Sequence, residues 1–417
     1  MATYVPASSV NFGNTTFRNN QNITSVDLKN IPFVNNSMDN AFRNAINLVS
    51  VTNINGYVTN MYRTFQHCDK LVDAPTIPNS VTTMNEIFTY CANLVNAPTI
   101  PESVKILSWT FMYCNSLVNA PIIPNSVTRL VQTFMGCTNL TNPPAIPNSV
   151  IDASGFISAC PLCFDPNKYP EIPQTVQCLD YMYSAMSNTE TDVPQWCMDK
   201  WNNCSVNVKT SMVGMFTGWH SLRNAPVIPN SVTNISYMFN DCINLVNIPV
   251  IPNSVINMAC TFQHCINLIN IPELPNSIKK MWFAFGHCNH LITAPNIPES
   301  VIELQSAFTD CTNLTGDINI LSNQITNAVN CFTNTTLTKN VYIPFTYENG
   351  VNTATYNAFT EAGYDTLGTQ HGVYLKDINP APIVVDYEYT TLDSGKVDLT
   401  KYIGTGGAIV TPLEIEE

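Results

Sequence analysis

Four residues with acid–base or metal-binding side chains recur at one interval in the C-terminal half of the sequence. They are Asp241, His264, His287 and Asp310, each 23 residues after the last. Stacked carboxylates and imidazoles can bind a divalent ion. The alternative is a solvated polar stripe, because the equivalent N-terminal positions hold tyrosine and glycine. The stripe is favoured, so we expect no metal and retain the four residues as candidates for ligand binding.

Cysteine is the second residue type that could do chemistry, with 15 in the chain. Nine occupy one position of the same 23-residue interval: Cys68, Cys91, Cys114, Cys137, Cys160, Cys242, Cys265, Cys288 and Cys311. Equivalent positions hold Trp219 and Ala45, so the position requires an apolar filler rather than a thiol. We expect buried free cysteines, and disulfides between neighbouring coils are the alternative.

Six further cysteines lie off this column: Cys163, Cys178, Cys197, Cys204, Cys260 and Cys331. Their spacings lack the short Cys-x-x-Cys pairs of structural zinc sites, which argues against zinc. One local disulfide or inert burial remain as interpretations.

The interval itself is the main feature of the chain. The stretch "TNISYMFNDCINLVNIPVIPNSV" is followed at once by "INMACTFQHCINLINIPELPNSI". Aligned on phenylalanine, the units centre on Phe42, Phe65, Phe88, Phe111, Phe134, Ile157, Phe216, Phe239, Phe262, Phe285 and Phe308. Degenerate units at Phe17, Tyr183 and Phe332 bring the total to about fourteen, and such a period is typical of a solenoid.

Each unit combines three local patterns. Ser80 precedes apolar residues at spacings of three and four, which predicts a short helical turn capped by the serine. Ser300 with Glu303 reads as a capping box. Leu94 and Ala97 are expected to face inward from a short parallel strand. The recurring Pro-x-Ile/Leu-Pro must be an extended corner, because proline lacks the N–H that a central strand needs.

The order Phe-x-x-Cys-x-x-Leu, then Pro, then Val and Phe again, resembles the BspA-like leucine-rich-repeat family over residues 17–337. The resemblance implies a leucine-rich-repeat solenoid of the α/β type, with short parallel strands and short helical turns. It also implies a surface-exposed adhesion or recognition module that is not an enzyme.

The regular units are interrupted and flanked by other segments. An irregular insertion near 161–210 contains Trp196, Asp199 and Trp201, which we expect either to bind a ligand or to cover a joint. Residues 1–16 form an N-terminal arm. Residues 338–378 are expected to form a small α+β cap, and residues 379–417 an acidic, β-rich tail or linker.

Composition excludes several function classes. A net charge of −13 argues against nucleic-acid binding, and no apolar run approaches the roughly 18 residues of a membrane span. No catalytic motif stands outside the repeat, so we expect neither an enzyme nor a cofactor. No signal peptide is visible in this sequence, and we expect an extracellular, cell-surface or virion-surface location.

The predicted function is a recognition or adhesion solenoid that binds a protein or glycan on a cell surface. The alternative is a structural component of a virion or surface assembly, such as a phage fibre or capsid decoration, in which neighbouring subunits are the partners.

Overall fold

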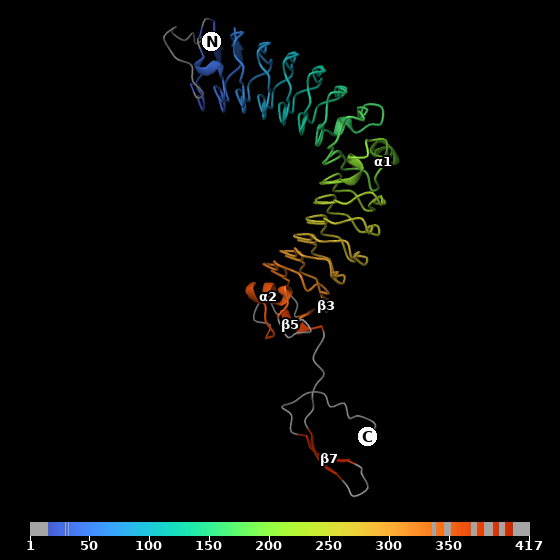
Figure 1. Ribbon diagram of the computed structural model, residues 1–417. Coiled ribbons are helices and arrows are strands. Elements are labelled where there is room, and N and C mark those ends of the chain that lie inside the picture. The colour runs from blue at the N-terminus through green and yellow to red at the C-terminus, as the bar shows by residue number, and fades with distance from the viewer. Residues whose placement is uncertain are drawn as a thin grey trace.

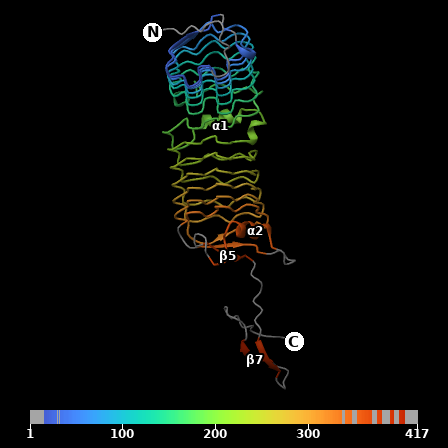
Figure 2. The ribbon, with the colours of Figure 1, turned by 90° about the vertical axis from the view of Figure 1, so that its left-hand side faces the viewer.

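The chain forms an elongated stack of coils. The computed structural model describes residues 16–29, 31, 33–335, 339–345, 352–367, 373–378, 387–391 and 397–402. Figure 1 shows the coils following a curved path from one end to the other, and Figure 2 shows them edge-on as parallel rungs. The predicted N-terminal arm and most of the predicted acidic tail lie outside the described residues.

The core is a stack of phenylalanine rings along the axis. Phe42 and Phe65 lie 5.5 Å apart between ring centroids with 8° between their planes, and Phe65 and Phe88 repeat this geometry at 5.5 Å and 7°. The stack resumes beyond the insertion, where Phe262 lies 5.7 Å from Phe285. These rings are fully buried, so each coil hides its largest apolar side chain only by resting on its neighbours.

Pairing between coils is parallel but very short. Strands β1 (Ser25–Asp27) and β2 (Ser50–Thr52) pair over three residues. Elsewhere in the regular coils the pairing shrinks to isolated bridges, such as Asn60 with Thr83 and Asp73 with Asn96. These two rows of bridges join neighbouring coils along two different edges. The regular coils therefore contain less β-strand than the sequence predicts.

A strip of turns replaces the predicted helical turn. Within 84–91, the N–H groups of Met84, Glu86, Phe88 and Tyr90 donate to carbonyls of the next coil, at 2.8 to 3.1 Å. Between them, N–H groups such as that of Cys91 donate to the residue three positions earlier. A helix would keep all its N–H groups for itself. Here every second N–H group donates to a carbonyl of the neighbouring coil instead.

The serines also act differently from the prediction. The Ser80 hydroxyl donates to the carbonyl of Val58 in the preceding coil, and Ser126 donates to Val104 at 2.7 Å. Glu303 pairs with Lys280 at 3.2 Å and forms no capping box. The predicted helix caps were therefore wrong: there is no helix to cap, and the hydroxyl satisfies a carbonyl of the coil before it.

The insertion adds residues without breaking the stack. It contains two 3₁₀ turns, η2 (Pro161–Cys163) and η3 (Val208–Thr210), and the helix α1 (Gln195–Asn202). Figure 1 shows α1 on the outer side of the bend. On either side, the Ala159 N–H still donates to the Ser184 carbonyl and the Ala185 N–H to the Thr217 carbonyl.

The C-terminal end of the stack carries longer elements. Parallel strands β3 (Ile318–Asn319), β4 (Lys339–Ile343) and β5 (Val373–Asp377) form one sheet in that order. The helix α2 (Ala354–Glu361) packs nearby, with the Phe359 ring 6.3 Å from that of Phe332. Beyond them, β6 (Tyr387–Thr391) and β7 (Val397–Tyr402) pair antiparallel. Near the other end lies a third 3₁₀ turn, η1 (Val34–Asn36).

Removing one ring from the stack should destabilise the whole solenoid. We expect Phe111→Ala to lower the free energy of unfolding by ~3–5 kcal/mol, because it leaves a cavity between two rings. Ile122→Ala is the matched control, since 89% of that side chain is exposed, and should change stability by less than ~0.5 kcal/mol. Urea unfolding followed by circular dichroism measures both. Equal effects would contradict the proposed dependence on the ring stack.

Candidate functional site

Two positions in each coil have a left-handed backbone, four residues apart. The first position is held by Asn40, Arg63, Glu86, Trp109, Gln132, Gly155, Tyr181, Gly214, Tyr237, Cys260, Phe283, Ser306 and Asn330. The second is held by Asn44, His67, Tyr90, Tyr113, Gly136, Ala159, Ala185, Gly218, Asp241, His264, His287, Asp310 and Asn334. We call the face formed by these two rows the turn face.

The turn face carries residues that its backbone does not favour. A left-handed φ suits glycine and asparagine, and costs other residues about 1–2 kcal/mol each. Yet Arg63, Glu86, Tyr90 and Trp109 have φ values of 54 to 64°. Their presence needs a reason other than local conformation.

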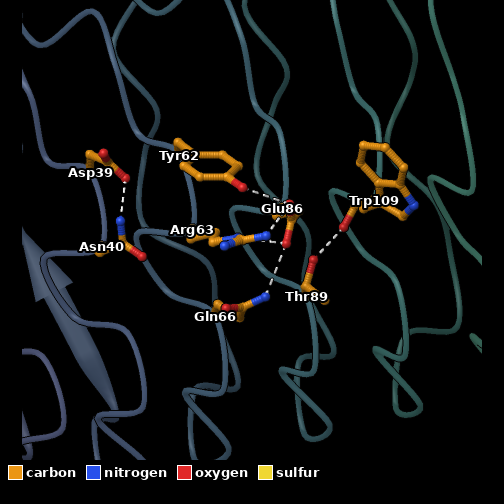
Figure 3. Close-up of polar contacts among 8 residues, drawn as sticks. All are labelled: Asp39, Asn40, Tyr62, Arg63, Gln66, Glu86, Thr89 and Trp109. Carbon is orange, nitrogen blue, oxygen red and sulfur yellow. Dashed lines mark hydrogen bonds and ion pairs between the residues drawn. The ribbon is translucent and has the colours of Figure 1, made fainter.

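Glu86 is the centre of a polar cluster on the N-terminal part of this face (Figure 3). It accepts hydrogen bonds from Tyr62 at 3.0 Å, from Arg63 Nε and Nη2 at 2.8 and 2.9 Å, and from Gln66 at 3.1 Å. The Glu86 side chain is only 15% exposed. Its hydrogen bond raises the pKa of Arg63, while burial, then Glu86, raises the pKa of Tyr62.

An aromatic row runs beside this cluster. The rings of His67 and Tyr90 stack at 4.5 Å, and those of Tyr90 and Tyr113 at 4.9 Å. Tyr113 then lies against Gly136, where an added Cβ would come within 2.4 Å of the ring. Glycine at that position is therefore needed both for the left-handed turn and for the ring that covers it.

The Asp/His residues predicted from the sequence lie in the same row, farther along the stack. His264 and His287 stack at 4.2 Å with 7° between their planes. His287 pairs with Asp310 at 3.2 Å, and Asp241 pairs with His220 at 3.0 Å. Among the described residues, no group of three or more His, Cys, Asp or Glu side chains is arranged to hold a metal ion.

The tryptophans of the insertion serve its interior. Trp201 is 1% exposed, and Trp196 is partly buried with its ring 5.0 Å from that of Phe164 and 5.7 Å from that of Tyr183. Asp199 lies exposed and accepts from its own helix neighbour Gln195 at 2.9 Å. Trp201 thus packs inside the insertion, whereas Trp196 keeps part of its surface exposed, so a contact role for Trp196 and Asp199 stays a prediction.

The cysteine column is buried, and its thiols have a task that the sequence analysis missed. In the described chain all 15 cysteines are free. The Cys91 thiol donates to the Phe65 carbonyl at 3.0 Å, and most of the column repeats this bond to the residue 26 positions earlier. Trp219, in the same column, donates its indole N–H to Tyr183 at 2.7 Å. The sequence signal for this role was the replacement of cysteine by Trp219, because a thiol and an indole N–H can both donate a hydrogen bond.

A second exposed surface lies at the proline corners. Ile122, Val227 and Val250 occupy the x of Pro-x-Ile-Pro and are 89%, 78% and 76% exposed. A shallow groove lined by Pro121, Ile122 and their counterparts in the next coil separates the coils there. These apolar side chains are not required by the core.

The sequence pattern of the BspA type leucine-rich repeat region matches residues 3–118, 213–282 and 236–363. The chain belongs to the BspA type leucine-rich-repeat family. Its fold is therefore a leucine-rich-repeat solenoid, and the family indicates a protein-interaction or adhesion role and typical surface exposure. No helix in the described part of the chain is both long and apolar enough to cross a membrane.

Solved structures of this kind are similar over most of the chain. A leucine rich cell surface protein from Faecalibacterium prausnitzii A2-165 shares 20% identity, covering 79% of this chain and 81% of that one, with a TM-score of 0.46. A leucine-rich repeat protein from Bacteroides ovatus ATCC 8483 shares 19% identity, covering 72% and 80%, with a TM-score of 0.40. No curated protein matches the sequence.

The thiols should react slowly in the folded chain. Burial raises the pKa of Cys91 and of Cys242 to about 12, so little thiolate forms at pH 8. We expect only Cys178, which is partly exposed, to react early with an aromatic disulfide reagent, although burial raises its pKa too. Unfolding in guanidinium should release all 15 thiols. Rapid reaction of many thiols in the native chain would contradict this burial.

The histidine stack should make stability depend on pH. Burial, then His287, lowers the pKa of His264, against the opposing effect of Asp241 and Asp310. Near and below pH 6.5 the unfolded state therefore binds more protons at His264 than the folded state does. The free energy of unfolding should therefore fall as the pH is lowered through this range.

The test compares unfolding midpoints of the native chain and His264→Asn. We expect the native chain to lose stability relative to the variant as the pH falls from about 7.5 to about 5. Asparagine suits the left-handed backbone, as Asn334 shows at the equivalent position. If the difference in unfolding midpoint between the native chain and His264→Asn stays constant with pH, His264 does not cause the pH dependence.

Proposed function

We propose that this chain is a non-catalytic recognition or adhesion solenoid that binds a protein or glycan on a cell surface through its turn face. One observation carries the proposal. At the two left-handed positions the backbone and its bonds between coils repeat, while the side chains range from glycine to tryptophan. Such a face can change its chemistry without changing its fold, which is what a recognition scaffold requires.

The charged groups of this face support binding rather than catalysis. Glu86 is engaged by Tyr62, Arg63 and Gln66 together, so its carboxylate is held as an acceptor. Asp310 is paired with His287 and also accepts from Asn334 at 2.8 Å. Four donors on Glu86 fill the roughly four acceptor sites of a carboxylate, which leaves it no open site for a substrate proton. The proposal needs neither a cofactor nor a metal.

We divide the chain into a repeat stack and a terminal cap. We assign the stack of about fourteen coils to residues 17–337 and a terminal cap to residues 338–378. Two contacts support the cap. The Phe332 N–H donates to the Tyr364 hydroxyl at 2.9 Å, and the Ile325 N–H to the Thr355 hydroxyl at 3.0 Å. These bonds cover the backbone of the last coil, which would otherwise be open.

The function is tested with fluorescently labelled full-length protein on a panel of bacterial, protist and animal cells. We expect saturable binding to at least one cell type. A variant with Arg63, Glu86, Tyr90 and Trp109 changed to asparagine, which keeps the left-handed turns, should lose most of it. Ile122→Ala on the proline corner is the control and should bind normally. Binding that survives in the turn-face variant would defeat the proposal.

A further inference from the structure

Hydrogen-bonding defects concentrate at one end of the turn face. Among the described residues, six buried side-chain polar atoms have no hydrogen-bond partner within the protein, and five of them fall between residues 40 and 85. They are Asn40 Oδ1, Arg43 Nε, Gln66 Oε1, Thr83 Oγ1 and Asn85 Oδ1. Each such atom costs about 1–3 kcal/mol. Proteins tolerate departures of this kind mainly where function requires them.

These atoms also give the patch a definite polarity. Gln66 donates its amide N–H to Glu86 at 3.1 Å, and Asn40 donates to Asp39 at 2.5 Å. A carboxylate only accepts hydrogen bonds, so both amides must turn their oxygens away from it. The layer beneath the face therefore holds buried amide and hydroxyl oxygens beside one unpaired donor, Arg43 Nε, and direct contact with a ligand falls to the exposed side chains above them.

The full charges on this part of the face cancel. Arg63 is paired with Glu86 by two hydrogen bonds, and Arg129 with Asp152 at 3.1 Å. The patch is thus close to neutral in a chain whose net charge is −13. Recognition here cannot rest on a strong electrostatic attraction.

Trp109 supplies the apolar part of the patch. Its indole N–H donates to Gln132 in the next coil at 2.8 Å, which fixes the ring across the gap between the coils. Figure 3 shows the ring extending away from the Glu86 cluster. Trp109 is partly exposed, and Tyr90 in the adjacent coil is 38% exposed although its ring stacks on those of His67 and Tyr113. An anchored indole with paired charges and phenol groups nearby suits a ligand with both C–H faces and hydroxyls.

We propose that the turn face from Asn40 to Gln132 binds a neutral oligosaccharide, with one sugar ring packed on Trp109. Sugar hydroxyls both donate and accept, so they match the phenol of Tyr90, which is 38% exposed, and the guanidinium of Arg63, whose side chain is 33% exposed. This inference deepens the proposed recognition function and rests on it. It selects a glycan over a protein because a flat, rigid indole held beside a neutral polar cluster fits a pyranose ring.

The test is calorimetric titration of the full-length chain with a panel of neutral hexasaccharides: cello-, manno-, xylo- and chitohexaose. Oligogalacturonate serves as the acidic comparison. We expect one neutral sugar to bind and the acidic one to bind more weakly. Trp109→Ala should weaken binding about tenfold, which is the order expected for loss of an aromatic stacking contact.

Two further variants keep the result interpretable. Tyr57→Ala is the matched control, because Tyr57 is an aromatic residue that is 39% exposed and lies outside both rows of the turn face. It should bind like the native chain. Trp109→Phe keeps a ring but loses the bond to Gln132, and should retain more affinity than Trp109→Ala. Circular dichroism confirms that each variant is folded.

Three results would overturn the inference. These are no neutral sugar bound at millimolar concentration, a preference for the acidic sugar, or equal affinity in Trp109→Ala and Tyr57→Ala. Cell binding separates this failure from failure of the proposed function. If binding to cells depends on the turn face and is removed by protease but not by glycosidases, the recognition function stands and the partner is a protein. If cells and sugars are both left unbound, both proposals fail.

Discussion

The hydrogen bonds between successive coils are the constraint on which the structure depends. Along each turn strip, every second N–H donates to the next coil, while residues between them close tight turns within their own coil. The chain must bend sharply and still aim alternate N–H groups along the axis. It does so by adopting a left-handed φ twice in each coil. The ring stack, the thiol bonds and the two side-chain rows all follow from that repeated geometry.

This arrangement explains how the stack tolerates its insertion. The bond from Tyr90 reaches Met112, 22 residues on, whereas the bond from Ala185 reaches Thr217, 32 residues on. Only the position in the coil is kept, so extra residues can leave the stack as α1 and a packed aromatic cluster. Trp219 replaces a column cysteine there and still donates to a backbone carbonyl. The buried carbonyl thus receives a second donor wherever the column holds cysteine or Trp219, although Ala45 shows that a residue without a donor is also accepted.

The same geometry separates stability from recognition. Phenylalanine, leucine and cysteine side chains point into the core, where they are fully buried in almost every regular coil. At the left-handed positions, Glu86 and Trp109 are partly exposed, whereas Gly155 is buried. The bonds between coils are the same in all three cases. Among the described residues, five of the six unpaired buried polar atoms lie in the N-terminal coils, whereas left-handed non-glycine residues occur along the whole stack. A long chain with few charges can therefore carry several chemically different patches on one rigid frame.

The 23-residue spacing by itself determined which residues share an environment. It placed Phe65, Phe88 and Phe111 in one column and predicted a solenoid, because a period of that length buries apolar side chains only by stacking. It also placed His264 beside His287. The spacing identifies equivalent residues whatever path the backbone follows between them.

Only the tertiary structure decided which atoms satisfy one another. Ser80 looked like a helix cap because its true acceptor, the Val58 carbonyl, lies in another coil. Trp201 looked like a contact residue because burial of an inserted segment depends on the aromatic cluster around it. The first row of the turn face left no sequence signal, since Glu86 and Trp109 are residues that a left-handed turn disfavours. Their conformation is imposed by bonds between coils, and those exist only once the coils are stacked.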